Sequence, residues 1–205
     1  MRCAGCGAKV AADVLSQAHD LCVIGRAGTG IDNVDVAEAT RRGIAVFNTP
    51  GVNANATAEH TLAMMLALSR QIPAAHRSLQ AGEWNRSHFR GRELRGRTLG
   101  LIGVGRGGAI VAAQAAALGM QVLATDPYRA SSARDPFKSV DLPTLLSGSD
   151  IVSVHAPLTE ETHHILGATQ LRQLPHGALV VNCARGGLVA EGALCEAIEE
   201  GHIGG

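Results

Sequence analysis

The chain has 205 residues, of which 46% are hydrophobic, 18% charged and 2% aromatic. The apolar fraction excludes a disordered chain. Basic and acidic residues number 18 each, so the formal net charge is zero. Electrostatics therefore give no reason to expect nucleic acid or an anionic membrane surface as a partner.

Export and membrane insertion are not expected either. The longest apolar stretch, residues 109–120, is shorter than the roughly 20 residues that a membrane span needs. The N-terminus lacks the apolar segment of a signal peptide, and the five cysteines show no disulfide-framework spacing, so we expect a cytoplasmic protein. Cys3 and Cys6 form a CxxC pair, which is half a zinc site, a redox pair or simply two terminal thiols. No second Cys or His pair completes four ligands, so no metal is predicted.

The first half of the chain predicts two short strands and a long helix. Strands over residues 21–25 and 44–47 flank a helix over 34–42. A long helix follows Pro50, capped by Asn55 or Thr57. Pro73 should kink or restart that helix. The polar stretch 80–97, which contains the single tryptophan Trp84, should form a surface connection.

From Thr98 onward, apolar runs alternate with helical patterns. Residues 99–103, 121–125, 151–155 and 178–182 predict strands, and residues 109–118, 142–146, 168–174 and 192–200 predict helices. Such alternation is typical of a doubly wound parallel sheet covered on both faces. The predicted fold class is therefore α/β.

A glycine motif follows the first strand of this region. Gly103, Gly105 and Gly108 match G-x-G-x-x-G between a strand and a helix, and Asp126 ends the next strand. In this motif the first glycine permits a tight turn, the second lets the backbone approach a pyrophosphate, and the third lets the helix pack on the strand. Amides at the helix start favour phosphate, which Arg106 could also contact.

Asp126 indicates which dinucleotide would bind. Its carboxylate can accept hydrogen bonds from the adenosine ribose and would repel a 2′-phosphate. The motif therefore predicts NAD rather than NADP, the alternative being a structural turn with an incidental aspartate.

Two later strands end in polar residues. Ligands of a doubly wound sheet lie beyond the carboxyl ends of its strands, where His155-Ala156-Pro157 and Asn182-Cys183-Ala184-Arg185 are found. The Arg185 guanidinium can hold a substrate carboxylate by two parallel hydrogen bonds and polarise the adjacent carbonyl. His155 is an acid–base candidate, but a histidine that lines the cofactor edge is the favoured interpretation. Cys183 has no visible base to make it a nucleophile.

These motifs resemble those of the D-isomer-specific 2-hydroxyacid dehydrogenases. The matching segments are VIGRAGTGIDNVD (23–35), FNTPGVNANATAEH (47–60), GRTLGLIGVGRGG (96–108), ATDP (124–127), SVHAPLTEET (153–162) and VNCARGGLVAEGAL (181–194). The resemblance implies a Rossmann-type NAD-binding domain over residues 50–205 and a partial, flavodoxin-like substrate domain over residues 1–49. It also implies a homodimer in the complete protein, joined by the helix after Pro50 and the segment around Trp84.

The resemblance further implies residue roles and a reaction. The positions matching cofactor contacts are Thr29, Arg106, Gly107, Asp126, Ala156 and Cys183. Arg185 matches the catalytic arginine, and Arg26, Ala27 and Gly28 belong to a loop that meets the substrate. The implied reaction is the oxidation of D-3-phosphoglycerate to 3-phosphohydroxypyruvate in serine biosynthesis, with hydride passing to NAD and a glutamate-supported histidine taking the proton. The alternative is another small 2-hydroxy acid, of the glyoxylate or hydroxypyruvate type.

The chain departs from the family pattern in two respects. The family's glutamate and histidine lie downstream of the helix over 192–200 and are not among the 205 residues, and the first strand and helix of the substrate domain are also missing. Ala190 stands where an acidic residue is common. We therefore expect either a catalytic dehydrogenase represented by an incomplete, largely inactive chain, or a non-catalytic NAD-binding module.

Overall fold

The computed structural model describes residues 8–129 and 132–205. The chain divides into two compact units, Met1–Ala54 and Asn55–Gly205, each with its own core. The CxxC pair, Cys3 and Cys6, lies outside the described residues. Across the described part of the chain, no helix combines the length and apolar character needed to cross a membrane.

The N-terminal unit is built on a two-stranded parallel sheet. Its elements are α1 (Ala12–Ser16), β1 (Val23–Arg26), α2 (Val36–Arg41) and β2 (Ala45–Asn48). Leu15, Ala39 and Ile44 form its buried core. Both strands and α2 confirm the prediction with shifts of one or two residues, whereas α1 was not predicted.

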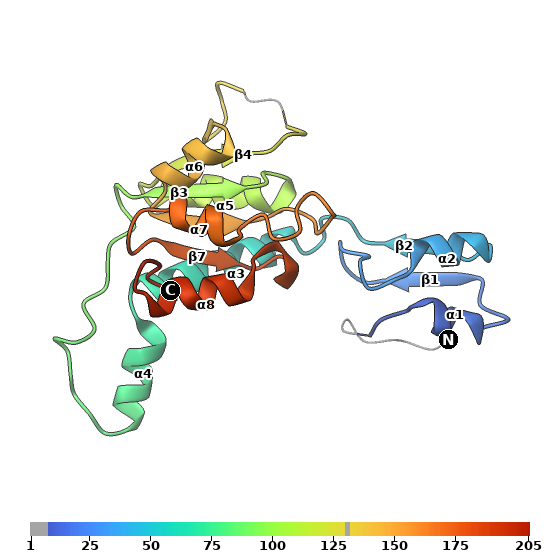
Figure 1. The fold of residues 1–205 in the computed structure, drawn as a ribbon, viewed down its shortest axis with the longest axis horizontal. Helices are drawn as coiled ribbons and strands as arrows, with labels where there is room; N and C mark the ends of the chain where they lie inside the picture. Colours follow the sequence, from blue (N-terminus) through green and yellow to red (C-terminus); the bar gives the residue numbers. More distant parts are fainter. Residues whose placement is uncertain (1–7, 130–131) are drawn as a thin grey trace. The chain divides into compact units, whose positions relative to one another are not determined.

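The C-terminal unit contains a five-stranded parallel sheet (Figure 1). Its strands are β3 (Thr98–Ile102), β4 (Gln121–Thr125), β5 (Lys138–Ser139), β6 (Ile151–Val154) and β7 (Leu179–Asn182). They lie in the order β5-β4-β3-β6-β7. The chain therefore winds outward from β3 in one direction and then crosses to β6 on its other side, which confirms the predicted doubly wound fold.

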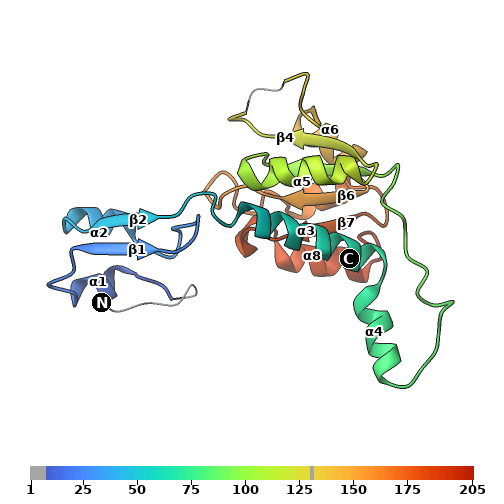
Figure 2. The same cartoon turned by 180° about the vertical axis from the view of Figure 1, so that it is seen from behind.

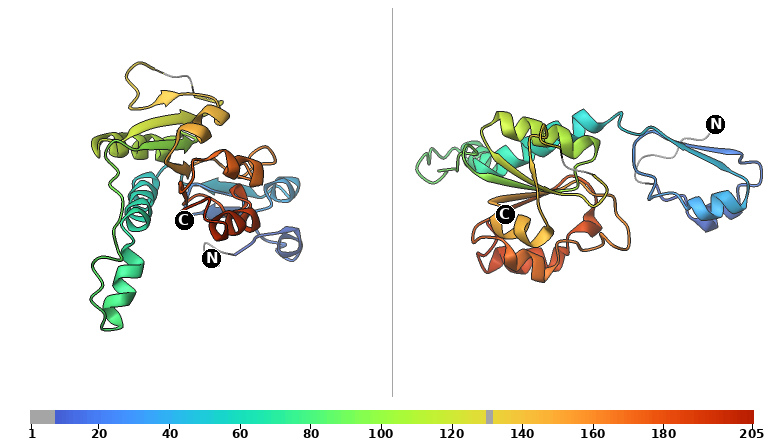
Figure 3. Two further views of the ribbon diagram at one scale, coloured as in Figure 1. Left: turned by 60° about the vertical axis from the view of Figure 1, so that its left-hand side comes forward. Right: turned by 90° about the horizontal axis from the view of Figure 1, so that it is seen from above.

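Helices cover both faces of this sheet (Figures 2 and 3). One face packs on α3 (Ala54–Ser69) and α5 (Arg106–Ala117) through a core that includes Met65, Leu99 and Val111. The other face packs on α6 (Leu142–Gly148), α7 (Ala168–Gln173) and α8 (Glu191–Glu199). Strand residues alternate between the two cores, so that Ile151 belongs to one and Val152 to the other.

In the C-terminal unit, two long helices start two or more residues earlier than predicted, and one short helix was not predicted. The long helix α3 begins at Ala54, so Asn55 and Thr57 lie within its first turn and neither is its cap. The glycine motif runs directly into α5, which starts at Arg106 rather than at residue 109. A short 3₁₀ helix, η1 (Gly186–Leu188), precedes α8 and was not predicted.

The helix α4 (Ile72–Gln80) restarts the chain after α3, as Pro73 predicts. Gln71 between the two helices adopts a left-handed backbone conformation with φ of 54°. No residue of α4 is buried, and the following residues 81–97, here called the arm, have no helix. The prediction of a surface connection is confirmed at Trp84, which is 74% exposed, but not at Leu94, which is buried in the core of the C-terminal unit.

Candidate active site

The glycine loop, residues 103–108, joins β3 to α5. Gly103 has φ of 91°, and its N–H donates to the carbonyl of Thr125 at 2.9 Å. A Cβ at Gly103 would lie 2.9 Å from the backbone carbon and oxygen of His155, which follows β6. Only glycine fits here, because the positive φ and the neighbouring backbone both exclude a side chain.

Gly108 and Gly105 have different surroundings. A Cβ at Gly108 would collide with the carbonyl oxygen of Gly103, so α5 packs directly on the loop. A Cβ at Gly105 would meet nothing within 4 Å, which leaves open space at that position. Gly105 is the N-cap of α5 and contributes no side-chain hydrogen bond. The first turn of α5 therefore suits an anion such as a pyrophosphate.

Asp126 follows β4 and is fastened to the glycine loop. One carboxylate oxygen accepts a hydrogen bond from the N–H of Val104 at 2.9 Å, and the other accepts one from the N–H of Tyr128 at 2.9 Å. Each carboxylate oxygen has a second lone pair. Asp126 can therefore keep both backbone contacts and still accept hydrogen bonds from ribose hydroxyls, so the loop and the carboxylate fit a dinucleotide.

His155, Ala156 and Pro157 follow β6, the strand beside β3. The His155 N–H donates to the carbonyl of Ile102 at 2.7 Å, and its ring Nε2 lies 2.9 Å from Oγ of the buried Ser153. Burial lowers the pKa of His155 from 6.5 to about 4. The ring is therefore neutral at pH 7 and hydrogen-bonds within its own unit.

Arg185 lies beyond the carboxyl end of β7. The Asn182 side chain shapes this turn, since its Nδ2 donates to the Arg185 carbonyl at 2.8 Å and its Oδ1 accepts from the Ala184 N–H at 3.0 Å. Arg185 and Glu191 line a cavity of about 330 Å³ together with apolar residues of β7 and α8. Cys183 lines a neighbouring groove of about 930 Å³ along β7.

The predicted substrate loop belongs to the N-terminal unit. It contains Arg26, Ala27, Gly28 and Thr29. The Gly28 N–H donates to Oγ1 of Thr49 at 2.8 Å, and the Thr29 carbonyl accepts from Nδ2 of Asn48 at 2.8 Å. The loop is thus tied to the end of β2. The predicted substrate-loop residues therefore lie in the N-terminal unit. The predicted site residues that follow β3, β4, β6 and β7 lie in the C-terminal unit.

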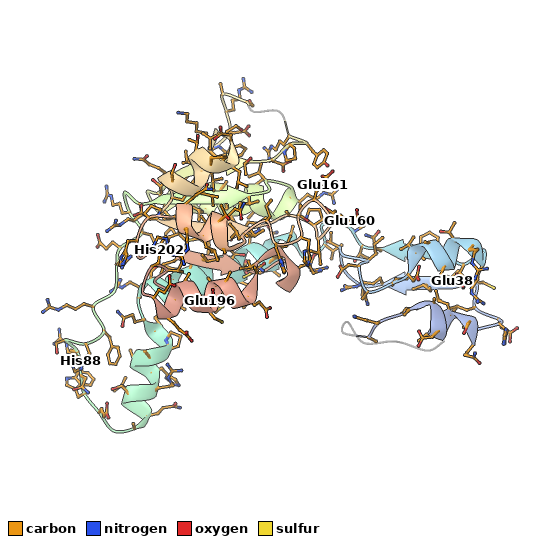
Figure 4. All side chains as sticks on the ribbon, in the orientation of Figure 1. Glu38, His88, Glu160, Glu161, Glu196 and His202 are labelled. Carbon is orange, nitrogen blue, oxygen red and sulfur yellow. The ribbon has the colours of Figure 1, made fainter. Side chains whose placement is uncertain are left out.

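No metal site is formed by the described residues. Among residues 8–129 and 132–205, histidine, cysteine, aspartate and glutamate side chains form no group of three that could hold an ion. In the C-terminal unit His88 lies on the arm, and Glu196 lies on α8 (Figure 4).

Sequence reasoning missed two groups beside these predicted residues. Arg129 donates a hydrogen bond to the Val104 carbonyl of the glycine loop, and Asp135 pairs with Arg129. Glu191 lines the Arg185 cavity. The spacing of Arg129 three residues after Asp126 was the available signal for the first of these, but spacing alone could not show its partner.

The fold and this site define a class of protein. A parallel sheet of this order, with a glycine loop after its central strand and a carboxylate after the next, is the architecture of dinucleotide-binding α/β domains. Residues 62–205 match the model of the D-isomer specific 2-hydroxyacid dehydrogenase family, NAD binding domain. The chain belongs to this family, and its cofactor is NAD.

Similar proteins include several dehydrogenases and reductases. The D-3-phosphoglycerate dehydrogenase of Archaeoglobus fulgidus is 49% identical over 197 residues, which are 95% of this chain and 37% of that protein. The hydroxypyruvate reductase of Thermotoga maritima is 44% identical over 95% of this chain and 63% of its own length. The NAD complex of a formate dehydrogenase from Staphylococcus aureus superposes with a TM-score of 0.90 at 33% identity, over 96% of this chain and 60% of that one. The chain thus spans less than two thirds of each of these proteins.

Proposed function

We propose that the C-terminal unit binds NAD at the glycine loop, and that Arg185 binds the carboxylate of a 2-hydroxy acid. The observation that carries this proposal is the glycine loop with Asp126 fastened against it. NAD, when bound, supplies the hydride acceptor for oxidation of the hydroxy acid. The proposed cofactor contacts also include Arg106, Gly107 and the residues that follow β6 and β7, namely His155, Ala156, Pro157, Cys183 and Ala184.

Arg185 would act by charge and geometry. Its guanidinium can donate two parallel hydrogen bonds to a carboxylate and draw electron density from the adjacent carbonyl. The apolar neighbours Val180, Val189 and Leu194 in the same cavity lower the local dielectric constant and so strengthen this interaction. The family resemblance further assigns Arg26, Ala27 and Gly28 to substrate contact and Thr29 to cofactor contact.

The substrate that we propose is D-3-phosphoglycerate, oxidised to 3-phosphohydroxypyruvate. The similarity to the Archaeoglobus fulgidus enzyme over nearly the whole chain supports this choice. A second candidate is hydroxypyruvate or glyoxylate, which the similarity to the Thermotoga maritima reductase favours. Comparing turnover of D-3-phosphoglycerate with reduction of hydroxypyruvate and glyoxylate, by NADH absorbance, distinguishes these substrates.

We expect the 205 residues alone to bind NAD but to turn over slowly. No histidine of the described chain lines the Arg185 cavity, and burial lowers the pKa of His155 to about 4, which makes its ring, hydrogen-bonded to Ser153, a weak base. Lack of a positioned acid–base group typically costs about 10² to 10⁴ in rate. Turnover near that of an ordinary dehydrogenase would contradict this expectation. NAD binding with no turnover of any of these hydroxy acids by the complete protein would favour the non-catalytic module.

We also propose that the complete protein forms a homodimer through α3, α4 and the arm. Ile72, Leu79 and Trp84 are all more than half exposed, and no residue of α4 is buried. Large apolar side chains left exposed along one segment are typical of interaction surfaces. Sedimentation of the wild type and of Trp84→Ala tests this, with a shift toward monomer expected in the variant. A wild type that sediments as a monomer would contradict the proposal.

Calorimetric titration with NAD tests the proposed cofactor site. Asp126→Ala should weaken NAD binding by about tenfold. The variant lacks the carboxylate that would accept hydrogen bonds from the ribose hydroxyls, and it also loses the hydrogen bond from the Val104 N–H. Asp150→Ala is the matched control, since Asp150 also accepts a backbone N–H but lies at the amino end of β6. NAD binding that is unchanged in Asp126→Ala, or equally weakened in both variants, would count against the site.

A further inference from the structure

Val104, inside the glycine loop, has both of its backbone polar groups bound by side chains that follow β4. Its N–H donates to Asp126 Oδ2 at 2.9 Å, and its carbonyl accepts from Arg129 Nη1 at 2.7 Å. A carboxylate and a guanidinium therefore flank one residue of the loop. If NAD binds as proposed above, both groups lie at the adenosine-ribose end of the site.

Arg129 is itself held by a second carboxylate. Its Nη2 donates to Asp135 Oδ1 at 2.9 Å, and the other oxygen of Asp135 accepts from the N–H of Ser132 at 2.8 Å. The guanidinium also lies over the Phe137 ring, with its carbon 5.1 Å from the ring centre. Asp135 is 12% exposed and Arg129 is 34% exposed, so solvent screens this ion pair only in part.

An arginine near the ribose is the group that usually accommodates the 2′-phosphate of NADP in folds of this class. Here the candidate arginine is bound to the Val104 carbonyl and neutralised by Asp135. We propose that Asp135, acting through Arg129, is a second determinant of the choice of NAD over NADP, beside Asp126. Asp126 repels the 2′-phosphate directly, whereas Asp135 keeps the guanidinium from binding it. This inference rests on the proposed cofactor site.

The competing explanation is that the Arg129–Asp135 pair only braces the glycine loop. A brace supports the pyrophosphate and both riboses of either dinucleotide, so its loss should weaken NAD and NADP equally. A determinant of selectivity should instead change the ratio of the two affinities. The ratio therefore separates the two roles.

The experiment measures NAD and NADP affinities of the 205-residue chain by calorimetry. Asp126→Ser removes the direct repulsion, and the double variant Asp126→Ser/Asp135→Asn also releases the guanidinium. We expect the double variant to bind NADP about tenfold more tightly, relative to NAD, than Asp126→Ser does, because a charge-assisted contact to phosphate is gained. Adding Arg129→Leu should abolish that gain.

The matched control is Asp126→Ser/Asp150→Asn. Asp150 resembles Asp135, since it pairs with an arginine, Arg97, at 3.0 Å through one oxygen and accepts a backbone N–H, that of Thr98, at 2.9 Å through the other. It lies at the amino end of the strands, so the affinity ratio should not change. Circular dichroism checks folding, and Asp135→Ser replaces Asp135→Asn if the latter unfolds.

The inference is overturned if the ratio of NADP to NAD affinity is the same in the double variant as in Asp126→Ser. It is also overturned if the gain in NADP affinity persists after Arg129→Leu is added. In both cases NAD binding by the wild type still leaves the proposed cofactor site intact. A wild type that binds no NAD overturns the proposed site and the inference together.

Discussion

Gly107 and Gly108 are neighbours in α5 with opposite constraints. A Cβ at Gly107 would meet nothing within 4 Å, whereas a Cβ at Gly108 would collide with the carbonyl of Gly103. Gly107→Ala should raise the free energy of unfolding by about 0.5–1 kcal/mol through helix propensity. Gly108→Ala should lower it, because the backbone of the loop must move. Urea unfolding of the two variants checks this, and equal effects would contradict the described packing.

His155 gives the stability a dependence on pH at the residue scale. Its pKa is about 4 in the folded chain against 6.5 when exposed, because burial disfavours the charged ring. Between these values the unfolded chain binds a proton that the folded chain does not. The free energy of unfolding should therefore fall as the pH drops from 6.5 toward 4, by up to about 1.4 kcal/mol per pH unit.

Urea unfolding at pH 7.5, 6 and 5 measures this slope. His155→Asn keeps a polar side chain beside Ser153 but has no proton to bind in this range. The variant should lose the part of the slope that His155 contributes. An identical slope in both proteins would show that His155 is not responsible.

At the scale of the element, α8 lacks a capping side chain. Its N-cap is Ala190, which makes no side-chain hydrogen bond, whereas Asp141 caps α6 by accepting from the Thr144 N–H at 2.9 Å. Hydrogen bonding to the Thr144 side chain, and then to its N–H, holds the pKa of Asp141 below its usual value.

Ala190→Asp should therefore stabilise the protein by about 1 kcal/mol, as N-cap aspartates typically do. Thermal unfolding at neutral pH measures the gain. Ala190→Leu serves as the control, because leucine offers no acceptor to the first turn. A gain of the same size in both variants would assign the effect to packing instead of capping.

The elements that the sequence predicts well are those with strong periodic signals. β4 lies over the predicted residues 121–125, and β3 lies one residue before the predicted 99–103, because continuous apolar runs next to glycine define buried strands. The missed elements are short. β5 has two residues, both exposed, and α1 has five, so neither produces a pattern that rises above its surroundings.

The candidate site also contains residues that the sequence predicts and residues that it does not. Gly103, Gly105, Gly108 and Asp126 are predictable, since one contiguous motif and the next strand end contain them. The ion pair of Arg129 with Asp135 is not, because the sequence does not reveal which way the chain turns after β4. Hydrogen bonds such as that of Arg129 to Val104 depend on this tertiary path.

At the scale of the whole molecule, the N-terminal unit has a small core of its own. Leu15 is fully buried there with Ala39 and Ile44, while its neighbour Val14 is 50% exposed. Leu15→Ala should cost about 2–5 kcal/mol of local stability, and Val14→Ala far less. Amide hydrogen exchange in β1 and β2 reports the difference. Equal protection in the two variants would contradict the assigned core.

The position of Gly103 against His155 also bears on the order of folding. The two residues meet because β3 and β6 are paired, although about fifty residues of chain separate the paired positions, the longest separation among the described strand pairs. Such a contact closes late, since a long loop must lose its entropy first. A dinucleotide held at this junction would therefore meet its complete site only after the transition state. It would slow unfolding of the chain and leave the rate of folding almost unchanged.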